Sequence, residues 1–300
     1  MRILLTGRTG QVGGALLPQL AAHDVIAPTR AEFDLRHAAE LASFVARVRP
    51  ELIVNCAADT AVDDAENNVA RADAVNATAP GALAVAAAAV GAGMLHFSTD
   101  YVFDGTATAP YRETDACAPI NAYGRSKRAG ELAVQASGAA HLIVRTSWVY
   151  AASGRNFLRT MLHLFAEREV VNVVADQIGA PTPATQIGAM IAAIVGRMEA
   201  GAAAHLSRQG GILNMACRGQ TSWHGFALAI LDEARRRGWK LKIRELRPIA
   251  SADYPTRAPR PRFSVFDLGR LEREFGLAPP DWRAALAELM DRLPAPPTEA

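Results

Sequence analysis

The first twenty-two residues constrain the fold more than any other stretch. Residues 1–6 form a short apolar run typical of a strand, glycines follow at Gly7, Gly10 and Gly13, and residues 14–22 show a helical pattern. In such a turn the first glycine permits a tight bend, the second lets backbone approach a pyrophosphate, and the third lets helix and strand pack closely. The helix N-terminus offers free N–H groups and a positive dipole end. Because this motif opens the chain between a strand and a helix, it favours a dinucleotide site over an ordinary glycine-rich turn.

Short apolar runs alternate with helical patterns through the first half of the chain. The expected strands are 24–27, 51–54, 93–97 and 141–145, and the expected helices are 37–48, 63–91 with a break near 67–68, and 123–136. This alternation predicts a parallel sheet with right-handed crossovers, in which ligands bind beyond the carboxyl ends of the strands. Gly7, Ala57, Thr99 and Trp148 all follow such ends. We therefore expect residues 1–150 to form an NAD(P)-binding, Rossmann-type, doubly wound α/β domain.

The alternation loosens after Trp148. Helices are expected at 156–167, 184–198, 223–237, 268–275 and 282–293, and strands at 170–174, 212–215 and 242–246. Three prolines exclude regular structure from residues 254–263. Residues 151–300 are predicted to form mainly a smaller, mixed α/β substrate-binding domain, from which a segment near 184–216 returns to the first domain.

Residues 98–127 carry the clearest chemical pattern. Tyr123 and Lys127 are four residues apart, so on a helix they share one face. A phenol, with a pKa of about 10, exchanges protons poorly at neutral pH unless a nearby cation lowers that pKa. A hydroxyl from Ser98 or Thr99 would complete a triad around a carbonyl, which suits proton transfer paired with hydride transfer. Tyr-x-x-x-Lys alone is a weak signal that a packed tyrosine and an exposed lysine would also give. Because the N-terminal glycine turn independently predicts a dinucleotide site, the Tyr-x-x-x-Lys spacing is a stronger signal in this chain than it is alone.

Composition narrows the class of protein. Half of the 300 residues are hydrophobic, 21% are charged and the net charge is +2, so no strong field selects nucleic acid or an anionic membrane. Residues 79–90 are too short to span a bilayer and predict a buried helix. Cys56, Cys117 and Cys217 are far apart and lack metal-ligand spacing, which fits a reducing cytoplasm. With no signal peptide recognised at the start, we expect a cytoplasmic protein without a metal site.

Seven stretches spread over nearly the whole chain form a recognisable set. They are GRTGQVG (7–13), VNCAADTAVDDAE (54–66), STDYVFDG (98–105), YGRSK (123–127), RTSWVY (145–150), DQIGAPT (176–182) and YPTRAPRPRFS (254–264). In this order they resemble the dTDP-4-dehydrorhamnose reductases of the extended short-chain dehydrogenase/reductase superfamily. GxxGxxG and YxxxK occur throughout that superfamily, whereas STDYVFDG together with RTSWVY and DQIGAPT is much more specific.

The resemblance implies that NAD(P)H reduces the 4-keto group of a nucleotide sugar, dTDP-6-deoxy-L-lyxo-4-hexulose, giving dTDP-L-rhamnose. It implies that Tyr123 is the proton donor, that Lys127 lowers the phenol pKa and holds the nicotinamide ribose, and that Thr99 hydrogen-bonds the carbonyl. The implied substrate residues are Thr99, Asp100, Trp148, Gln177 and Arg257. The implied cofactor residues are Gly7, Gly10, Gln11, Val12, Gly13, Arg30, Asp34, Leu35, Ala57, Ala58, Thr60, Tyr123 and Lys127. The alternatives are core packing for Trp148, a turn cap for Asp100 and a rigid surface loop around Arg257.

Arg8 and Arg30 flank the expected adenosine ribose, where arginine accommodates a 2′-phosphate, so we expect NADPH, with NADH as the alternative. Certain family members dimerise through a magnesium ion held by glutamates. The corresponding positions here are Ala15 and Thr185, which are not acidic. The resemblance therefore leaves a homodimer open but does not support that metal-dependent form.

Two other functions remain open. The first is a nucleotide-sugar epimerase or dehydratase of the same superfamily, which would purify with tightly bound oxidised cofactor and show no net NAD(P)H consumption. The second is a non-catalytic NADP-binding regulatory subunit, because proteins resembling these reductases bind methionine adenosyltransferase. The presence of Tyr123, Lys127 and Thr99 argues against the second.

Overall fold

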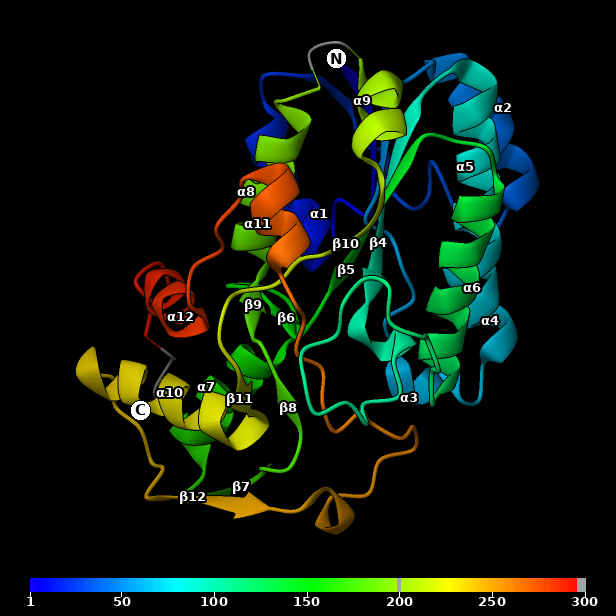
Figure 1. Ribbon diagram of the computed structural model, residues 1–300. Coiled ribbons are helices and arrows are strands. Elements are labelled where there is room, and N and C mark those ends of the chain that lie inside the picture. Colours follow the sequence, from blue (N-terminus) through cyan, green and yellow to red (C-terminus); the bar gives the residue numbers. More distant parts are fainter. Residues whose placement is uncertain (199–200, 296–300) are drawn as a thin grey trace.

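The computed structural model describes residues 1–198 and 201–295, and it is built on one large parallel sheet (Figure 1). The strand order is β10-β5-β4-β3-β1-β2, and every pairing is parallel. Because β2 and β3 lie on opposite sides of β1, the order reverses there, which confirms the predicted doubly wound α/β fold. The strands are β1 (Arg2–Thr6), β2 (Asp24–Ile26), β3 (Leu52–Asn55), β4 (Gly93–Thr99), β5 (His141–Thr146) and β10 (Gly211–Asn214).

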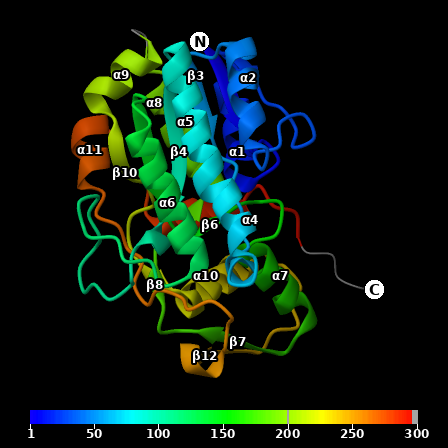
Figure 2. The ribbon, with the colours of Figure 1, turned by 90° about the vertical axis from the view of Figure 1, so that its right-hand side faces the viewer.

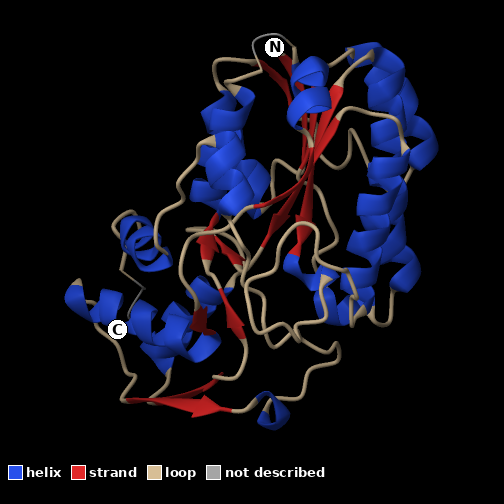
Figure 3. Ribbon diagram, viewed as in Figure 1, coloured by secondary structure: helices blue, strands red, loops and turns tan. Residues whose placement is uncertain are grey.

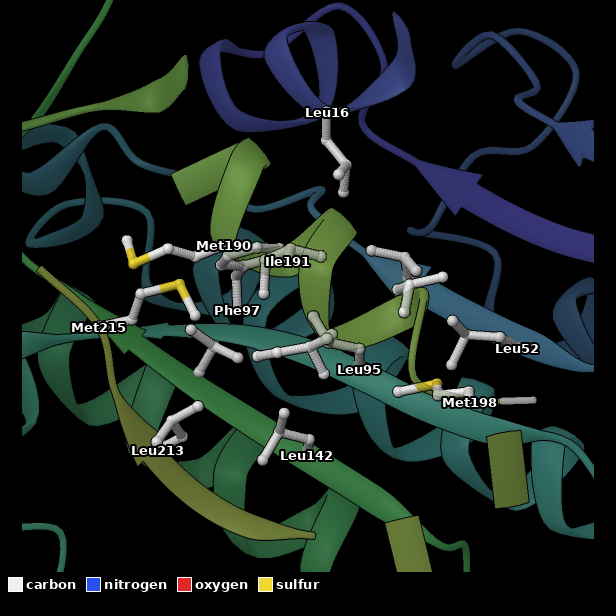
Figure 4. Close-up of a cluster of buried hydrophobic side chains, with 14 of the residues drawn as sticks. Leu16, Leu52, Leu95, Phe97, Leu142, Met190, Ile191, Met198, Leu213 and Met215 are labelled. Carbon is white, nitrogen blue, oxygen red and sulfur yellow. The ribbon is translucent and has the colours of Figure 1, made fainter. Parts of the chain in front are cut away.

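Helices cover both faces of this sheet (Figure 3). Side chains alternate along each strand, so Ile3 and Leu5 enter one core while Leu4 enters the other. The first core includes Leu16, Leu95 and Met190 (Figure 4). It lies under α1 (Gln11–Leu16), α8 (Ala184–Val195), α9 (Ala202–Gln209) and α11 (Gly269–Phe275). The second lies under α2 (Ala38–Val48), α5 (Ala79–Val90) and α6 (Ala122–Ala136), which stand side by side in Figure 2.

The predicted break in the helical region 63–91 is present. α3 (Val62–Ala65) ends before Asn67, and α4 (Val69–Asp73) continues through a π-helical turn (Ala74–Thr78) into α5. The continuous run Val69–Val90 is long and apolar enough, by length and composition alone, to cross a membrane. However, α5 packs between α2 and α6 and buries Leu83 and Ala84 against the sheet. Its packing is that of a core helix.

A second, smaller group of elements lies beyond the carboxyl ends of the sheet (Figure 1). Phe165, Phe226 and Trp282 anchor its separate hydrophobic core. Its helices are α7 (Phe157–Glu167), α10 (Trp223–Arg236) and α12 (Trp282–Met290). Its strand pairs are β7 (Val170–Val174) with β12 (Glu245–Ile249), β8 (Ile178–Gly179) with β11 (Thr221–Ser222), and β6 (Val149–Tyr150) with β9 (Thr182–Pro183). By contrast, α8 and β10 belong to the packing of the large sheet.

Several elements differ from the sequence prediction, which did not include the short strands β6, β8, β9 and β11. The strand expected at 242–246 lies at 245–249, because Pro248 does not stop it. A proline is tolerated here since β12 pairs only with β7, which leaves its other edge free of ladder hydrogen bonds. Helix α9 was not predicted. It is stabilised by tertiary contacts, through buried Ala202 and Leu206, which the local pattern does not reveal.

Candidate active site

The carboxyl ends of β1, β3, β4 and β5 open into one cavity of about 750 Å³. Most of the residues proposed for cofactor and substrate line it, although they come from distant parts of the chain. They are Gly7, Gly10, Gln11, Val12, Arg30, Asp34, Leu35, Ala57, Ala58, Thr60, Thr99, Asp100, Tyr123, Lys127 and Trp148, together with Arg8. Gly13, Gln177 and Arg257 do not line it.

The glycine turn forms a backbone cradle at one end of the cavity. Gly7 has φ +73°, and a Cβ there would lie 2.7 Å from the Ala57 nitrogen. A Cβ on Gly13 would lie 2.3 Å from the Gly7 carbonyl oxygen, so Gly13 shapes the turn from behind. No side chain caps the first turn of α1, which leaves backbone N–H groups for an anion. Gln11 Oε1 is buried without a hydrogen-bond partner among the described residues. These features fit a dinucleotide pyrophosphate.

Charged side chains surround the neighbouring region of the cavity. Asp34 accepts hydrogen bonds from Arg36, whose guanidinium holds the Asp34 pKa well below its usual value. Arg30 Nε lies 3.8 Å from Asp34 Oδ2. Arg8 lines both this cavity and an adjoining one of about 610 Å³ that also contains Arg47. Several cations therefore lie at this end.

The start of α6 presents Tyr123 and Lys127 to the cavity. Asn121 caps the helix, since its Oδ1 accepts a hydrogen bond from the Gly124 nitrogen at 2.7 Å. Gly124 is required for close packing, because a Cβ there would lie 2.1 Å from the Tyr101 carbonyl oxygen. Both functional side chains are almost fully buried. Lys127 Nζ donates a hydrogen bond to the Phe97 carbonyl oxygen at 2.7 Å.

The ionisation of these two groups differs from the sequence expectation. Burial raises the pKa of the Tyr123 phenol above its ordinary value, and a hydrogen bond with Thr99 opposes this only partly. Burial therefore outweighs any lowering of the phenol pKa by the Lys127 ammonium, whose Nζ donates to the Phe97 carbonyl. Burial lowers the pKa of Lys127 to about 8, against the attraction of the Glu131 carboxylate. At neutral pH the site therefore holds a protonated phenol.

Thr99 and Asp100 line the cavity where β4 ends. Thr99 Oγ1 donates a hydrogen bond to Asp100 Oδ1 at 3.0 Å and accepts one from the Tyr101 nitrogen at 3.2 Å. The Asp100 side chain is buried, with 3% of its surface exposed, and burial raises its pKa to about 6.

Trp148 is supported by residues that the sequence analysis missed. Its indole stacks on Trp223, and it packs so closely on Gly179 that a Cβ there would lie 2.3 Å from the ring. Gln177 lies behind this wall and accepts a hydrogen bond from Trp223 Nε1 at 3.2 Å. Trp223 and Arg155 both line the cavity. No local motif marks Trp223, because its contact with Trp148 arises only from the fold.

Arg257 lies in the irregular segment 254–263 and is exposed. Next to it, Arg260 Nη2 lies 2.6 Å from Asp63 Oδ2, an ion pair that fastens this segment to α3. At Ala15 and Thr185, the two backbone carbonyls accept hydrogen bonds from the Gln19 side chain. Within residues 1–198 and 201–295, no group of three or more His, Cys, Asp or Glu side chains could hold a metal ion.

Comparison with known proteins gives a consistent result. Residues 1–294 match the family described as "RmlD substrate binding domain". The chain is 47% identical over 291 residues to a dTDP-4-dehydrorhamnose reductase of Burkholderia thailandensis, covering 95% of this chain and 97% of that protein. It is 42% identical over 299 residues to the enzyme of the same name from Shigella flexneri, covering 98% of each.

Among solved structures, it resembles the Bacillus anthracis dTDP-4-dehydrorhamnose reductase crystallised with NADP. The TM-score is 0.88 at 34% identity, and the match covers 97% of this chain and 99% of that one. With the family match and both curated relatives spanning nearly the full chain, this protein belongs to the family of the dTDP-4-dehydrorhamnose reductases.

Proposed function

We propose that this chain uses NADPH to reduce the 4-keto group of dTDP-6-deoxy-L-lyxo-4-hexulose, yielding dTDP-L-rhamnose in the last step of dTDP-rhamnose biosynthesis. One observation carries the proposal. Tyr123, Lys127 and Thr99 line the same cavity as the glycine turn, in a chain 47% identical to a curated reductase of that name. NADPH supplies the hydride when bound.

Tyr123 is the proposed proton donor to the substrate oxygen. A donor must carry its proton before the reaction, and burial keeps the Tyr123 phenol protonated throughout the neutral range. The cavity places this phenol beside the Thr99 hydroxyl. The two hydroxyls can therefore approach one carbonyl oxygen, with Tyr123 transferring its proton as negative charge develops there.

Lys127 is proposed to hold the nicotinamide ribose. Its hydrogen bond to the Phe97 carbonyl fixes the ammonium at the floor of the cavity, with only 2% of the residue exposed. An ammonium has three donors, so one bond to Phe97 leaves two for ribose hydroxyls. The same positive charge would stabilise the Tyr123 anion that remains after proton transfer.

The cofactor and substrate are proposed to occupy opposite ends of the cavity. The cradle of Gly7, Gly10 and Gly13 suits the pyrophosphate of the cofactor, and Arg8 and Arg30 suit a 2′-phosphate. Asp34 and Leu35, which also line the cavity, are assigned to the adenine side of the cofactor, and Ala57, Ala58 and Thr60 to the cofactor where it crosses β3. Asp100, Trp148 and the exposed Arg257 are assigned to the nucleotide sugar. Gln177 would act indirectly, through Trp223.

We further propose a division of labour between the two groups of elements. Residues 1–150 and a segment near 184–216 bind the cofactor, and residues 151–300 otherwise mainly bind the substrate. The last five residues of that range lie outside the described structure. Cys56, Cys117 and Cys217 are all free, which supports the proposed cytoplasmic location. A homodimer also stays a proposal, and light scattering of the purified protein would test it.

The direct test is product formation. Purified protein would be mixed with dTDP-6-deoxy-L-lyxo-4-hexulose and either NADPH or NADH, with absorbance at the nicotinamide band and mass spectrometry of the nucleotide sugar as readouts. We expect NADPH oxidation matched by a nucleotide sugar that is heavier by two hydrogens. Tightly bound oxidised cofactor with an isomerised or dehydrated sugar would instead favour an epimerase or dehydratase. A binding partner without turnover would favour the regulatory function.

A further inference from the structure

Asp100 is a buried carboxyl group that is assigned to the nucleotide sugar but has no part yet in the transfer of a proton to the carbonyl oxygen. It follows β4, is 3% exposed, and lines the cavity beside Thr99. Its Oδ2 atom has no hydrogen-bond partner among the described residues. A buried, unpaired carboxylate is costly, because its charge loses hydration without compensation. If the Asp100 carboxyl served only to cap a turn, it would not need to be buried.

Hydroxyls and phenols, rather than cations, surround this carboxyl. Thr99 approaches from the end of β4, Ser147 from the end of β5, and Ser264 from the segment that crosses below the sheet. The titratable groups facing it are the phenols of Tyr101 and Tyr123. Lys127, the buried cation of the cavity, is engaged with a backbone carbonyl instead. Asp100 can therefore change its protonation state without breaking an ion pair.

Counting the hydrogen bonds of Thr99 shows what that change would do. A hydroxyl has one proton to donate and two lone pairs that accept. With Asp100 ionised, the Thr99 proton points to Asp100 Oδ1, and the Tyr101 N–H occupies one lone pair. The remaining lone pair can only accept. Thr99 then cannot donate to a substrate carbonyl.

With Asp100 protonated, the direction of the bond reverses. The carboxylic acid donates to Thr99 Oγ1, and the Tyr101 N–H keeps the other lone pair. Both lone pairs are then used, so the Thr99 proton must point elsewhere, into the cavity where the Tyr123 phenol lies and the substrate carbonyl would bind. We propose that Asp100 is a positioning residue that sets the donor direction of the Thr99 hydroxyl, so that the acid form of Asp100 is the form that polarises the substrate carbonyl.

This inference rests on the proposed function and adds a pH dependence to it. Burial raises the pKa of the Asp100 carboxyl to about 6. We expect kcat/KM to fall as pH rises through this value. Loss of one donor to a developing oxyanion costs roughly 10²- to 10³-fold, so the fall should level off at that depth.

The test compares pH profiles of kcat/KM for four proteins. Wild type should show the fall. Asp100→Asn should be flat, because an amide N–H can donate to Thr99 Oγ1 as the acid does. The kcat/KM of Thr99→Val should not depend on pH and should equal the value that wild type reaches at high pH. Asp24→Asn, an exposed carboxylate at the opposite end of the sheet, is the control and should keep the wild-type profile.

The double variant Thr99→Val/Asp100→Asn separates this role from an independent one. If Asp100 acts only through Thr99, the double variant should be no slower than Thr99→Val. The inference would be overturned if the loss of kcat/KM in the double variant equalled the product of the two single losses. A wild-type pH profile in Asp100→Asn would also overturn it.

A measurement without turnover keeps the inference independent of the proposed substrate. The Asp100 pKa can be measured by NMR of carboxyl carbon in wild type and in Thr99→Val. Because Thr99 donates to the carboxylate, removing its hydroxyl should raise that pKa. An unchanged pKa would contradict the inference even if the enzyme proved active. If no keto sugar were reduced at any pH, the proposed function would be wrong. A raised Asp100 pKa in Thr99→Val would still support the coupling between Asp100 and Thr99.

Discussion

The indole rings of Trp148 and Trp223 stack with centroids 3.5 Å apart and planes 2° from parallel. Trp148 follows β5 of the large sheet, whereas Trp223 begins α10 of the smaller group of elements. Trp148 also has φ +47°, a left-handed backbone conformation that is unusual for a bulky residue. The stack therefore helps to hold a strained residue at the cavity wall, where both rings are exposed to a ligand.

Truncation of Trp223 should weaken substrate binding selectively. An aromatic pair contributes about 0.5–1.5 kcal/mol beyond buried area, so Trp223→Ala should raise the KM for the nucleotide sugar about threefold to tenfold. The KM for NADPH should stay unchanged, because the glycine turn follows β1 whereas Trp148 follows β5, with β3 and β4 between these strands. Trp223→Phe keeps a stacking ring and serves as the control. A KM for NADPH that rose as much as the KM for the nucleotide sugar would contradict this assignment.

Gly13→Ala should abolish cofactor binding. The added Cβ would lie 2.3 Å from the Gly7 carbonyl oxygen, so the turn must move away from its present shape. We expect at least a hundredfold loss of NADPH affinity in fluorescence titration. Gly196→Ala is the control, since a Cβ there lies no closer than 3.4 Å to its neighbours. Retained affinity in Gly13→Ala would show that the cradle does not bind the cofactor.

The ion pair between Glu131 and Arg145 should support stability. Arg145 donates to both Glu131 oxygens at 2.8 Å, and both side chains are buried. Leaving one charge of such a pair unpaired typically costs about 3–5 kcal/mol, which is the loss in unfolding free energy expected for Glu131→Gln. Glu272→Gln, which breaks an exposed pair with Arg218, should cost about 1 kcal/mol or less. Denaturant unfolding would measure both.

The pH dependence of that difference has a definite sign. Burial alone would raise the Glu131 pKa, but the Arg145 guanidinium outweighs it and holds the pKa below its ordinary value. A group with a depressed folded-state pKa contributes stability above its unfolded-state pKa and loses it as pH falls through the folded-state value. The wild-type advantage over Glu131→Gln should therefore be full at pH 7 and shrink under acid conditions. An advantage that grew on acidification would contradict the ionised pair.

Arg8 should favour NADPH over NADH. Arg8 lines both adjoining cavities, of which the first is also lined by Arg30 and the second by Arg47. A hydrogen bond to a charged group contributes about 1.5–3 kcal/mol, so Arg8→Ala should lower kcat/KM with NADPH by roughly tenfold or more. The value with NADH should hardly change, which makes NADH an internal control. A parallel loss with both cofactors would place Arg8 at the pyrophosphate instead.

The sequence predicted the layout of the large sheet because that layout follows from local patterns. Alternating apolar runs and the glycine turn determine a parallel sheet, and the sheet gathers its carboxyl ends into one site. The site residues on those ends, such as Thr99 and Trp148, could therefore be placed together without coordinates. STDYVFDG and RTSWVY then pointed to the family.

The remaining features depend on contacts between distant residues. Trp223 was missed because nothing near it in sequence marks its stack on Trp148. The spacing of Tyr123 and Lys127 predicted a lowered phenol pKa, because it shows that the two side chains share a helix face but not that burial raises the Tyr123 pKa. Burial, which decides the Tyr123 and Asp100 pKa values, likewise arises only when the chain is folded.

The most direct test of the central claim compares wild type with Tyr123→Phe in NADPH oxidation. The substrate is dTDP-6-deoxy-L-lyxo-4-hexulose, and NADPH affinity is measured alongside to verify that the variant is folded. General acid catalysis contributes about 10²- to 10⁴-fold, so kcat should fall by that factor while NADPH affinity stays unchanged. Equal rates for both proteins would contradict the assignment of Tyr123 as the proton donor.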